Sequence, residues 1–516
     1  MKMRLLPARA AIFILCWEII GRYHLVGAGA LPPPSLILGQ WWIDRALYPP
    51  HILATAGPAA AGFLLGNLLA VLAAIVFTLL PPLERLFLGC NIAVFAVPAI
   101  ALAPVLVITL SGKWPQIVLA AVSVYFPTMV ATLLGLREVD SRPLDVIRSY
   151  GGGSLAAVRL VRWRSCLPAM FSGLRVAAPA AILGAILAEF GSGSRWGLGS
   201  FLLGSLGRAN PSRLWGIGLT ATALAAGVYG VFSYLGRRIA GATLSTSISV
   251  SADAGEIRDK EAPWVRILLT AGAVLMPFVV WNGVLALSHL SPIVARTPID
   301  LLHYLTTGSD SANAREILLG ALSESLPLAA LGLFIGLGCA LLFACIGFIR
   351  PRLGSALMPM ALLLQSMPLV ALTPLIVLLF GRDILATVMV TVSVTFFPAY
   401  VTIAQGLLQV PQAATEVLEI YGASRLQRLR FVALPGSLPY LCTAARLVAP
   451  RALLGVMMAE WLATGYGLGN LLNQSRGELD YDMIWTVAAA SAAVSIVFYL
   501  IVQSVERRVR TRYTSG

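Results

Sequence analysis

The stretch GAILAEFGSGSRWGLG at residues 184–199 recurs as GVMMAEWLATGYGLG at residues 455–469. Each copy places a glutamate at the end of an apolar run and follows it, within ten residues, with Gly-Leu-Gly. The two copies are offset by 270–271 residues, and the same offset relates many other positions of the chain. Chance composition does not produce so many matches at one spacing, so the chain contains two related units.

The matches extend through both units. They include Pro98 with Pro368, Phe126-Pro127 with Phe397-Pro398, Tyr150-Gly151 with Tyr421-Gly422, Leu167-Pro168 with Leu438-Pro439, Arg175 with Arg446, and Glu189 with Glu460.

The composition indicates a membrane protein. Of the 516 residues, 58% are hydrophobic and 12% are charged, and the mean hydropathy is +0.84. Soluble chains carry about 25% charged residues, so this chain has too little polar surface for a soluble enzyme, a disordered protein or a secreted disulfide scaffold. Because a spanning helix needs about 20 residues, we expect an all-α polytopic membrane protein with about 12 transmembrane helices.

Apolar runs of membrane-spanning length define these helices. They lie near 9–28, 56–80, 86–110, 115–136, 167–190 and 214–235, and again near 265–288, 324–348, 355–380, 384–408, 438–462 and 484–504. Glu18 and Arg22 interrupt the first run, but they stand four residues apart and can pair on one helix face. A cleaved signal peptide is the alternative for this run, because basic residues precede it.

Prolines interrupt the third run of each unit, at Pro98 and Pro104 and at Pro368 and Pro374. A helix break at membrane depth is tolerated where it lines a cavity. These runs therefore either line a solute path or contain simple packing kinks.

The domain boundaries follow from the repeat. Residues 1–238 form the first unit, the polar segment 239–263 is a cytoplasmic linker, and residues 264–516 form the second unit. Six spans per unit is an even number, so the two six-helix repeats run parallel and are related by a pseudo-twofold axis along the membrane normal. A solute path is expected on that axis, between the halves.

The net charge of +14 is explained by topology. With the N-terminus inside, cytoplasmic segments hold 24 basic residues, and the opposite side and its rim hold 10. Basic residues accumulate in cytoplasmic loops, so we expect both termini to be cytoplasmic. The excess charge then gives no reason to expect nucleic-acid binding.

A polar segment separates the fourth and fifth runs of the second unit. It begins at Glu416, reaches Tyr421-Gly422, and continues after nine residues as Val432-Ala433-Leu434-Pro435. A charged start, an apolar face, a glycine break and a Leu-Pro stop predict a short helix–turn–helix. Its apolar face suits the groove of a partner protein; an ordinary amphipathic interface helix is the alternative.

This segment resembles the EAA loop of ATP-binding-cassette (ABC) importer permeases, in which a Glu is followed by a Gly and later by hydrophobic-x-Leu-Pro. With MAEW at 458–461, GYGLGNLL at 465–472 and LPPPS at 31–35, the chain is similar to the nitrate/sulfonate/taurine importer family. The resemblance implies two type I ABC importer permease units fused in tandem. It implies that 411–437 is a coupling helix that docks into an ATPase subunit, with Glu416, Gly422, Val432, Leu434 and Pro435 as its motif positions.

The first unit departs from this motif. Asp145 replaces the glutamate, Gly151 is retained, Val161 occupies the hydrophobic position, and Trp163-Arg164 replaces Leu-Pro. We hypothesise that the two coupling elements engage their ATPase subunits unequally. Drift in a tolerant loop is the alternative.

The resemblance also implies the partners and the location. These are two ABC ATPase subunits on the cytoplasmic face, an extracytoplasmic solute-binding protein, and the lipid bilayer of a bacterial inner membrane. A P-loop requires G-x-x-x-x-G-K-[ST], and none of the three lysines lies in that setting. We therefore expect no catalytic site and no cofactor in this chain, with ATP bound and hydrolysed on the partner subunits.

Five ionisable residues inside the spans are candidates for the solute path or its gate, because charge within a membrane is costly and commonly functional. They are Arg175, Glu189, Arg446, Arg451 and Glu460. Arg451 has no counterpart in the first unit. The arginines either contact an anionic solute or bind helix-end carbonyls and reach the interface, and the glutamates are gate or loop-anchoring groups.

These observations predict the permease subunit of an ATP-driven importer for a nitrate-, sulfonate- or taurine-like small anion. A secondary transporter, or an ABC importer for a metal ion, thiamine or a vitamin precursor, remains the alternative. A membrane enzyme is disfavoured because the four histidines show no metal-ligand spacing. The six cysteines lie in or beside apolar runs, so neither a metal site nor disulfides are expected.

Overall fold

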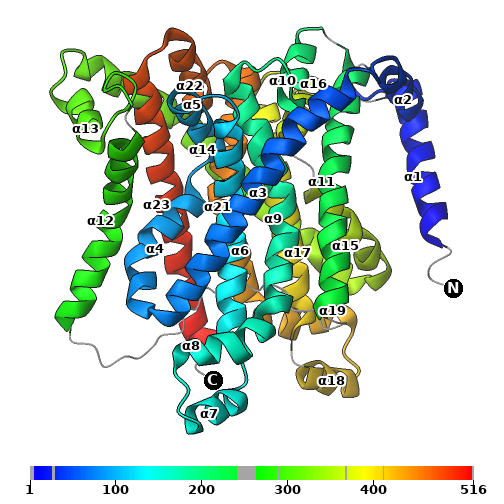
Figure 1. Ribbon diagram of the computed structural model, residues 1–516. Helices are drawn as coiled ribbons and strands as arrows, with labels where there is room; N and C mark the ends of the chain where they lie inside the picture. The colour runs from blue at the N-terminus through cyan, green and yellow to red at the C-terminus, as the bar shows by residue number, and fades with distance from the viewer. Residues whose placement is uncertain are drawn as a thin grey trace.

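The computed structural model describes residues 5–25, 29–208, 210–240, 263–288, 290–365, 369–410 and 412–513. These residues form helices and connecting turns, and no strand occurs among them. The helices stand side by side, with small helices at both ends of the bundle (Figure 1). Most of the linker predicted at 239–263 lies outside the described residues.

The helices of the first unit follow the predicted runs. They are α1 (Leu5–Arg22), α2 (Pro34–Ile43), α3 (Tyr48–Leu79), α4 (Pro81–Ala96), α5 (Ala99–Thr109), α6 (Trp114–Arg137), α7 (Ser141–Ser149), α8 (Ser154–Ala157), the π-helical turn η3 (Val158–Arg162), α9 (Trp163–Ser192), α10 (Leu198–Leu206) and α11 (Pro211–Ala240).

The second unit repeats this order. It contains α12 (Pro263–Ser288), α13 (Pro298–Thr306), α14 (Ser311–Ile349), α15 (Pro351–Gln365), α16 (Leu369–Phe380), α17 (Ile384–Leu408), α18 (Gln412–Ile420), α19 (Arg425–Arg428), η5 (Leu429–Ala433), α20 (Leu434–Gly436), α21 (Leu438–Ala459), η6 (Glu460–Thr464), α22 (Gly467–Glu478) and α23 (Tyr481–Tyr513).

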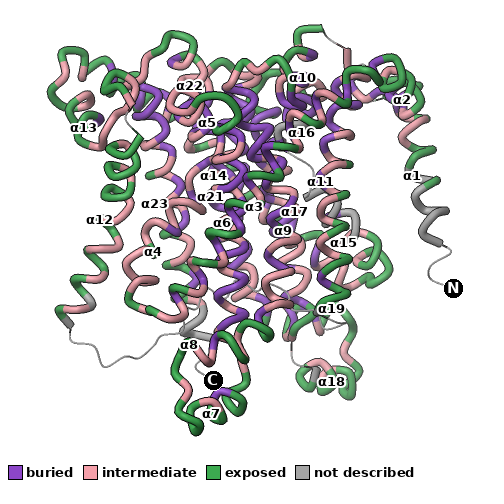
Figure 2. The backbone as a smooth tube through the Cα atoms, in the orientation of Figure 1, coloured by how far each residue is buried: buried purple, intermediate pink, exposed green. Residues whose placement is uncertain are grey.

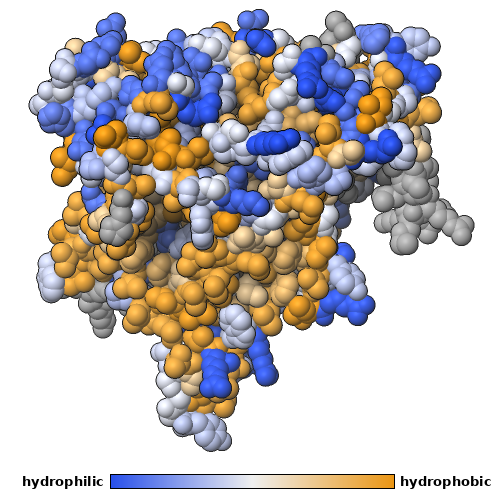
Figure 3. Space-filling model, turned by 45° about the horizontal axis from the view of Figure 1, so that its top comes forward, coloured by the Kyte–Doolittle hydropathy of each residue, from blue (hydrophilic) through white to orange (hydrophobic). Residues whose placement is uncertain are grey.

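Nine helices of the described chain are long and apolar enough to cross a membrane, and the bent pair α4 and α5 makes a tenth if it counts as one span. Apolar side chains cover the middle of the molecule beneath a hydrophilic cap (Figure 3). The weakest predicted run, 9–28, is not among these nine; α1 is short and carries Arg9, Glu18 and Arg22. Arg22 pairs with Glu18 at 2.9 Å, as the spacing predicts.

The break in the third run occurs at the predicted proline. Pro98 is extended, with φ −62° and ψ 122°, and it precedes the first residue of α5. Proline cannot donate the backbone hydrogen bond that would continue α4, and α4 and α5 are bent by 97° at this point. The equivalent Pro368 lies outside the described residues, between α15 and α16.

The two units interlock. The first helix of the second unit, α12, packs against α4 of the first unit, and α16 packs against α9, α10 and α11. In return, α5 of the first unit packs against α21, α22 and α23. The symmetry extends to aromatic pairs that join the first and last helices of each unit, Trp17 with Trp215 and Trp281 with Trp485, whose ring centroids are 5.4 Å apart in both cases.

Several segments that the sequence predicts to be cytoplasmic lie at one end of the bundle. The helices α7 and α18, the end of α11, the start of α12 and the end of α23 all lie at the lower end in Figure 1. The small helices α10, α13 and α22 lie at the upper end. Buried residues concentrate in the upper and central parts of the bundle, where the two units meet (Figure 2).

Candidate functional site

The interface between the units is lined by the last long helices before each Gly-Leu-Gly, α9 and α21, and by the short helices α5 and α16. Each short helix packs against the long helix of the opposite unit, α5 against α21 and α16 against α9. The break at Pro98 is what allows α5 to leave the direction of α4 and enter the interface. A solute path on the pseudo-twofold axis would therefore run among these four helices.

Glu189 anchors the upper end of the first unit. Thr55 in α3 donates its hydroxyl hydrogen to Glu189 Oε1 at 2.7 Å, and the Gly199 N–H donates to Glu189 Oε2 at 2.7 Å. The Leu198 N–H in turn donates to Thr55 Oγ1 at 2.8 Å. The carboxylate and the Thr55 hydroxyl thus each satisfy one N–H group of the first turn of α10, where the positive end of the helix dipole lies.

Glu460 repeats this arrangement in the second unit. Ser325 in α14 donates to Glu460 Oε1 at 2.7 Å, and the Gly469 N–H donates to Glu460 Oε2 at 2.8 Å. The Leu468 N–H donates to Ser325 Oγ at 2.8 Å. The loop-anchoring role that the sequence suggests for both glutamates thus matches their hydrogen bonds, whereas a gating role stays a prediction.

The first glycine of each Gly-Leu-Gly is required by this contact. Gly197 has φ +146° and Gly467 has φ +83°, a region that residues with a side chain rarely adopt. A β-carbon at Gly197 would lie 2.5 Å from the carboxyl carbon of Glu189, and one at Gly467 would overlap the Glu460 carboxylate. The motif therefore brings the backbone directly onto the glutamate.

Arg446 is held in a buried ion pair. Its Nε lies 3.1 Å from Oε2 of Glu506 in α23, and both side chains are almost fully buried. Thr443 donates its hydroxyl hydrogen to the other carboxylate oxygen at 2.9 Å. This partner was not foreseen from the sequence, which left Arg446 either in the path or bound to helix-end carbonyls.

Arg175, the counterpart of Arg446, has a different environment. Its guanidinium lies over the ring of Tyr229 in α11, 5.6 Å from the centroid. At the 270-residue offset that relates Trp215 to Trp485, Gly236 occupies the position equivalent to Glu506, and the Arg175 Nε is buried without a hydrogen-bond partner. The two arginines are related in sequence, but only the second is neutralised by a carboxylate.

Arg451 differs from both. It lies in the middle of α21 and is half-buried. No hydrogen bond, ion pair or ring contact joins it to any described residue. The five predicted path candidates are therefore not one cluster, because the glutamates lie at the upper end and the arginines face different neighbours.

Two helix–turn–helix arms form the lowest part of the molecule, as the sequence predicts. The first is α7 followed by α8 and η3, and the second is α18 followed by α19, η5 and α20 (Figure 1). Gly151 and Gly422, with φ +76° and +73°, end the first helix of each arm. The left-handed conformation at these turns explains why glycine stands at both positions.

The arms expose apolar side chains. Tyr150 and Tyr421 beside the glycines are 89% and 84% exposed, and Ile420 and Leu426 are also exposed. Asp145 pairs with Arg148 at 3.0 Å in the first arm, while Arg428 pairs with Glu419 in the second. Exposed apolar groups on a protruding arm are typical of a protein-docking surface.

The remaining motif positions lie where each arm joins its long helix. Val161 lies in η3, Val432 in η5, and Leu434 and Pro435 in α20, while Glu416 is exposed on α18. In the second arm the helix ends at Gly436, directly after Leu-Pro, and resumes at Leu438. In the first arm, where Trp163-Arg164 replaces Leu-Pro, the chain is helical without interruption from Ser154 to Ser192. The two arms are therefore connected to the membrane helices differently.

One polar contact joins the two units near the upper end. Arg476 in α22 donates from Nη1 to the Gly191 carbonyl in α9 at 3.1 Å, and its guanidinium lies over the Trp461 ring. Burial lowers the pKa of this guanidinium. The contact links the last turn of α9 to the small helix of the opposite unit.

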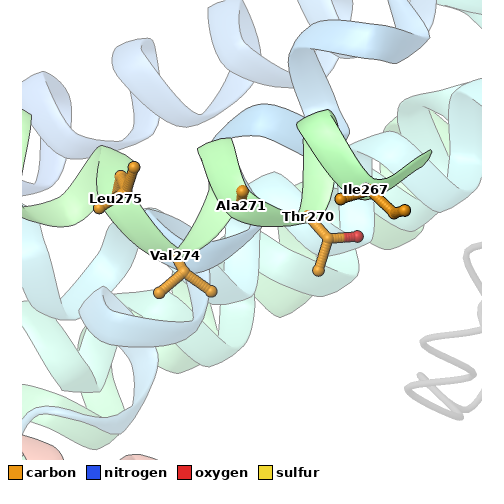
Figure 4. A pocket seen from close by; sticks show the side chains of 5 residues that line it. All are labelled: Ile267, Thr270, Ala271, Val274 and Leu275. Atoms are coloured by element: carbon orange, nitrogen blue, oxygen red, sulfur yellow. The ribbon is translucent and has the colours of Figure 1, made fainter. Parts of the chain in front are cut away.

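A shallow groove on α12 is lined by Ile267, Thr270, Ala271, Val274 and Leu275 (Figure 4). It is open and almost entirely apolar, and it lies on the exposed side of a candidate membrane span. Its chemistry suits lipid chains rather than a charged solute. Among the described residues, no group of three metal-ligating side chains is brought together.

Comparison with known proteins identifies the family. The pattern of the family described as "Binding-protein-dependent transport system inner membrane component" matches residues 66–241 and again 315–511. The chain belongs to this family. The two matches coincide with the two structural repeats, so the protein is a tandem permease of an ABC importer.

Relatives of the permease include the taurine transport system permease protein of Escherichia coli, 27% identical over 47% of this chain and 89% of the relative. The formylaminopyrimidine transport permease protein of Halalkalibacterium halodurans is 26% identical over 45% of this chain and 90% of the relative. The riboflavin transport system permease protein of Chloroflexus aurantiacus is 34% identical over 30% of this chain, and the match spans 58% of that relative. Each match covers no more than about half of the tandem permease.

The contact between the glycine motif and the glutamate predicts that substituting Gly467 destabilises the permease, whereas substituting a glycine in open space does not. Gly467→Ala should lower the free energy of unfolding of the permease by about 1–3 kcal/mol, because the backbone conformation is strained for alanine and the new methyl group overlaps Glu460. Gly477→Ala, in the open last turn of α22, should leave stability unchanged or raise it. Thermal unfolding in detergent measures both, and equal effects would contradict the assignment.

The buried ion pair predicts that Arg446 contributes more to stability than its counterpart Arg175. Arg446→Gln should cost about 3–5 kcal/mol, because it leaves the Glu506 carboxylate buried without its partner. Arg175→Gln should cost less, about 0.5–2 kcal/mol, because it removes only a cation–π contact. Replacing both Arg446 and Glu506 with leucine should recover most of the loss. If Arg175→Gln proved as costly as Arg446→Gln, the ion pair would not be the stabilising contact.

Proposed function

We propose that this permease carries a small anionic solute inward along the interface between its units, driven by two ATPase subunits that bind its arms. The observation that supports this most directly is the pair of exposed arms at one end of a two-fold repeated bundle. Each arm ends a helix at a left-handed glycine and presents a tyrosine and other apolar groups outside the apolar belt. Such a surface suits a groove on a partner protein.

We infer the orientation of the permease in the membrane from the position of the two arms. ATP is available in the cytoplasm, so the lower end in Figure 1, where the arms lie and α23 ends, is taken as the cytoplasmic side. The predicted excess of basic residues, 24 against 10, favours the same orientation. The upper helices α10, α13 and α22 then face outward, where a solute-binding protein would deliver the solute to the interface.

The substrate class is proposed from the relatives and from charge. Relatives of the permease are named for the transport of taurine, aliphatic sulfonates and formylaminopyrimidine. Membrane-embedded arginines are compatible with a sulfonate or another small anion. A vitamin precursor is the second candidate, since the riboflavin and formylaminopyrimidine permeases are also relatives.

Association with ATPase subunits is the first test. The permease, co-expressed with an ABC ATPase and a solute-binding protein encoded beside it, should co-purify with two ATPase copies. ATP hydrolysis by the complex should rise when loaded binding protein is added. A secondary transporter would instead accumulate solute in proteoliposomes under an ion gradient without ATP, and that result would contradict the proposal.

The arms differ, so their substitutions should differ as well. Gly151→Arg and Gly422→Arg place the same strained and charged residue at equivalent turns. We expect Gly422→Arg to reduce transport-coupled ATP hydrolysis several-fold more, because the second arm keeps the full motif and has fewer basic residues. Equal losses from the two substitutions would refute unequal coupling.

A further inference from the structure

Arg451 lies at the centre of a membrane span. The helical span Leu438–Thr464 places thirteen residues on each side of it, about 20 Å of helix in either direction. A charged side chain at this depth is costly unless it is paired or faces a polar space. Its surroundings therefore decide what it can do.

The guanidinium of Arg451 is not fully covered by protein. The residue keeps part of its surface accessible. No described residue pairs with it, and none of its nitrogen atoms is among the buried polar atoms that lack a partner. Nitrogens that are neither bonded nor covered must face accessible space.

The direction of this space follows from helix geometry. Arg446 and Arg451 are five residues apart, so their side chains leave α21 about 140° apart. Arg446 points to Glu506 in α23. Arg451 instead shares a partly accessible stripe with Leu447 and Leu454, one turn before and one turn after it.

The first unit has the same stripe at the same offset. Val176, Ala180 and Leu183 in α9 are partly accessible, and Val176 is 40% exposed. These residues are equivalent to Leu447, Arg451 and Leu454. The helices that carry the two stripes contact the opposite unit, because α5 packs against both α21 and α23, and α16 packs against both α9 and α11.

We propose that Arg451 is the contact for the negatively charged group of a small organic anion that crosses between the two units. This assignment rests on the proposed permease function and narrows it to one residue and one class of solute. The guanidinium is permanently charged and matches a carboxylate or sulfonate with two parallel hydrogen bonds. The apolar stripe residues suit an aliphatic body on the same molecule.

One cation, rather than a symmetric pair, suits transport. Ala180 occupies the equivalent position in the first unit, so the anion meets a single guanidinium at mid-depth. Conduction requires binding that is strong enough to admit a solute and weak enough to release it. Two facing arginines would bind an anion more tightly, while none would leave its charge uncompensated.

The charge at this position can be measured by cysteine reactivity. In a variant whose six native cysteines are replaced, Leu447→Cys places a thiol one turn from Arg451. Membrane-impermeant anionic and cationic methanethiosulfonate reagents then compete for it. Because Arg451 attracts the anionic reagent, adding Arg451→Gln should lower the anionic-to-cationic rate ratio about tenfold. Ethanesulfonate should slow the labelling while Arg451 is present.

The matched control is Ala452→Cys, which is fully buried beside Arg451 and should label at least tenfold more slowly than Leu447→Cys. An unreactive Leu447→Cys, or a rate ratio that Arg451→Gln leaves unchanged, would overturn the proposal. This measurement needs neither the ATPases nor the binding protein. It therefore decides the assignment of Arg451 even if the permease function itself were wrong.

Uptake in the reconstituted complex gives the second readout. Arg451→Gln should lower ethanesulfonate or taurine uptake at least tenfold while changing binding-protein-stimulated ATP hydrolysis less than twofold, and Arg451→Lys should retain most uptake. The double variant Ala180→Arg/Arg451→Ala transfers the arginine to the equivalent position of the first unit, and it should restore part of the lost uptake. Unchanged anion uptake with Arg451→Gln would refute the role of Arg451. Wild-type protein that moves no solute with ATP would instead refute the proposed function.

Discussion

The structure depends on the requirement that polar groups inside a membrane find their partners within the protein. At Glu189 and Glu460 this requirement is met by a hydroxyl from α3 or α14 and by one backbone N–H in the first turn of the next small helix. The carboxylates thereby hold α10 and α22 across the tops of the bundles. Gly197 and Gly467 are needed because the backbone approaches the carboxylates so closely.

Several polar groups differ between the two units despite the pseudo-twofold symmetry, and these differences show where the units have diverged. Arg446 has a carboxylate partner and Arg175 has an aromatic ring, although the two arginines are equivalent in the repeat. Alanine stands at position 180, the counterpart of Arg451, and the two arms join their membrane helices differently. Fusion of two units in one chain allows each half to specialise, because each position can change without altering its counterpart.

Much of this architecture could be predicted from the sequence, because its signals are local. Hydropathy marked the spans, Pro98 marked the bend, and the glycines at 151 and 422 marked the turns of the arms. The partners of the charged groups could not be predicted. Thr55 is 134 residues from Glu189, and Glu506 directly precedes a run of arginines near the end of α23, so its sequence context resembles a solvated basic tail. The packing of α12 against α4 of the other unit likewise leaves no periodic signal.

We propose that the ATPase subunits draw the two arms together when they bind ATP and thereby open and close the interface between the units. Spin labels at Arg159→Cys and Arg430→Cys, equivalent exposed positions on the two arms, report the distance between them. In the complex with ATPase subunits, binding of a non-hydrolysable ATP analogue should shorten this distance, and removal of the nucleotide should restore it. A distance that is the same with and without the nucleotide would contradict the account.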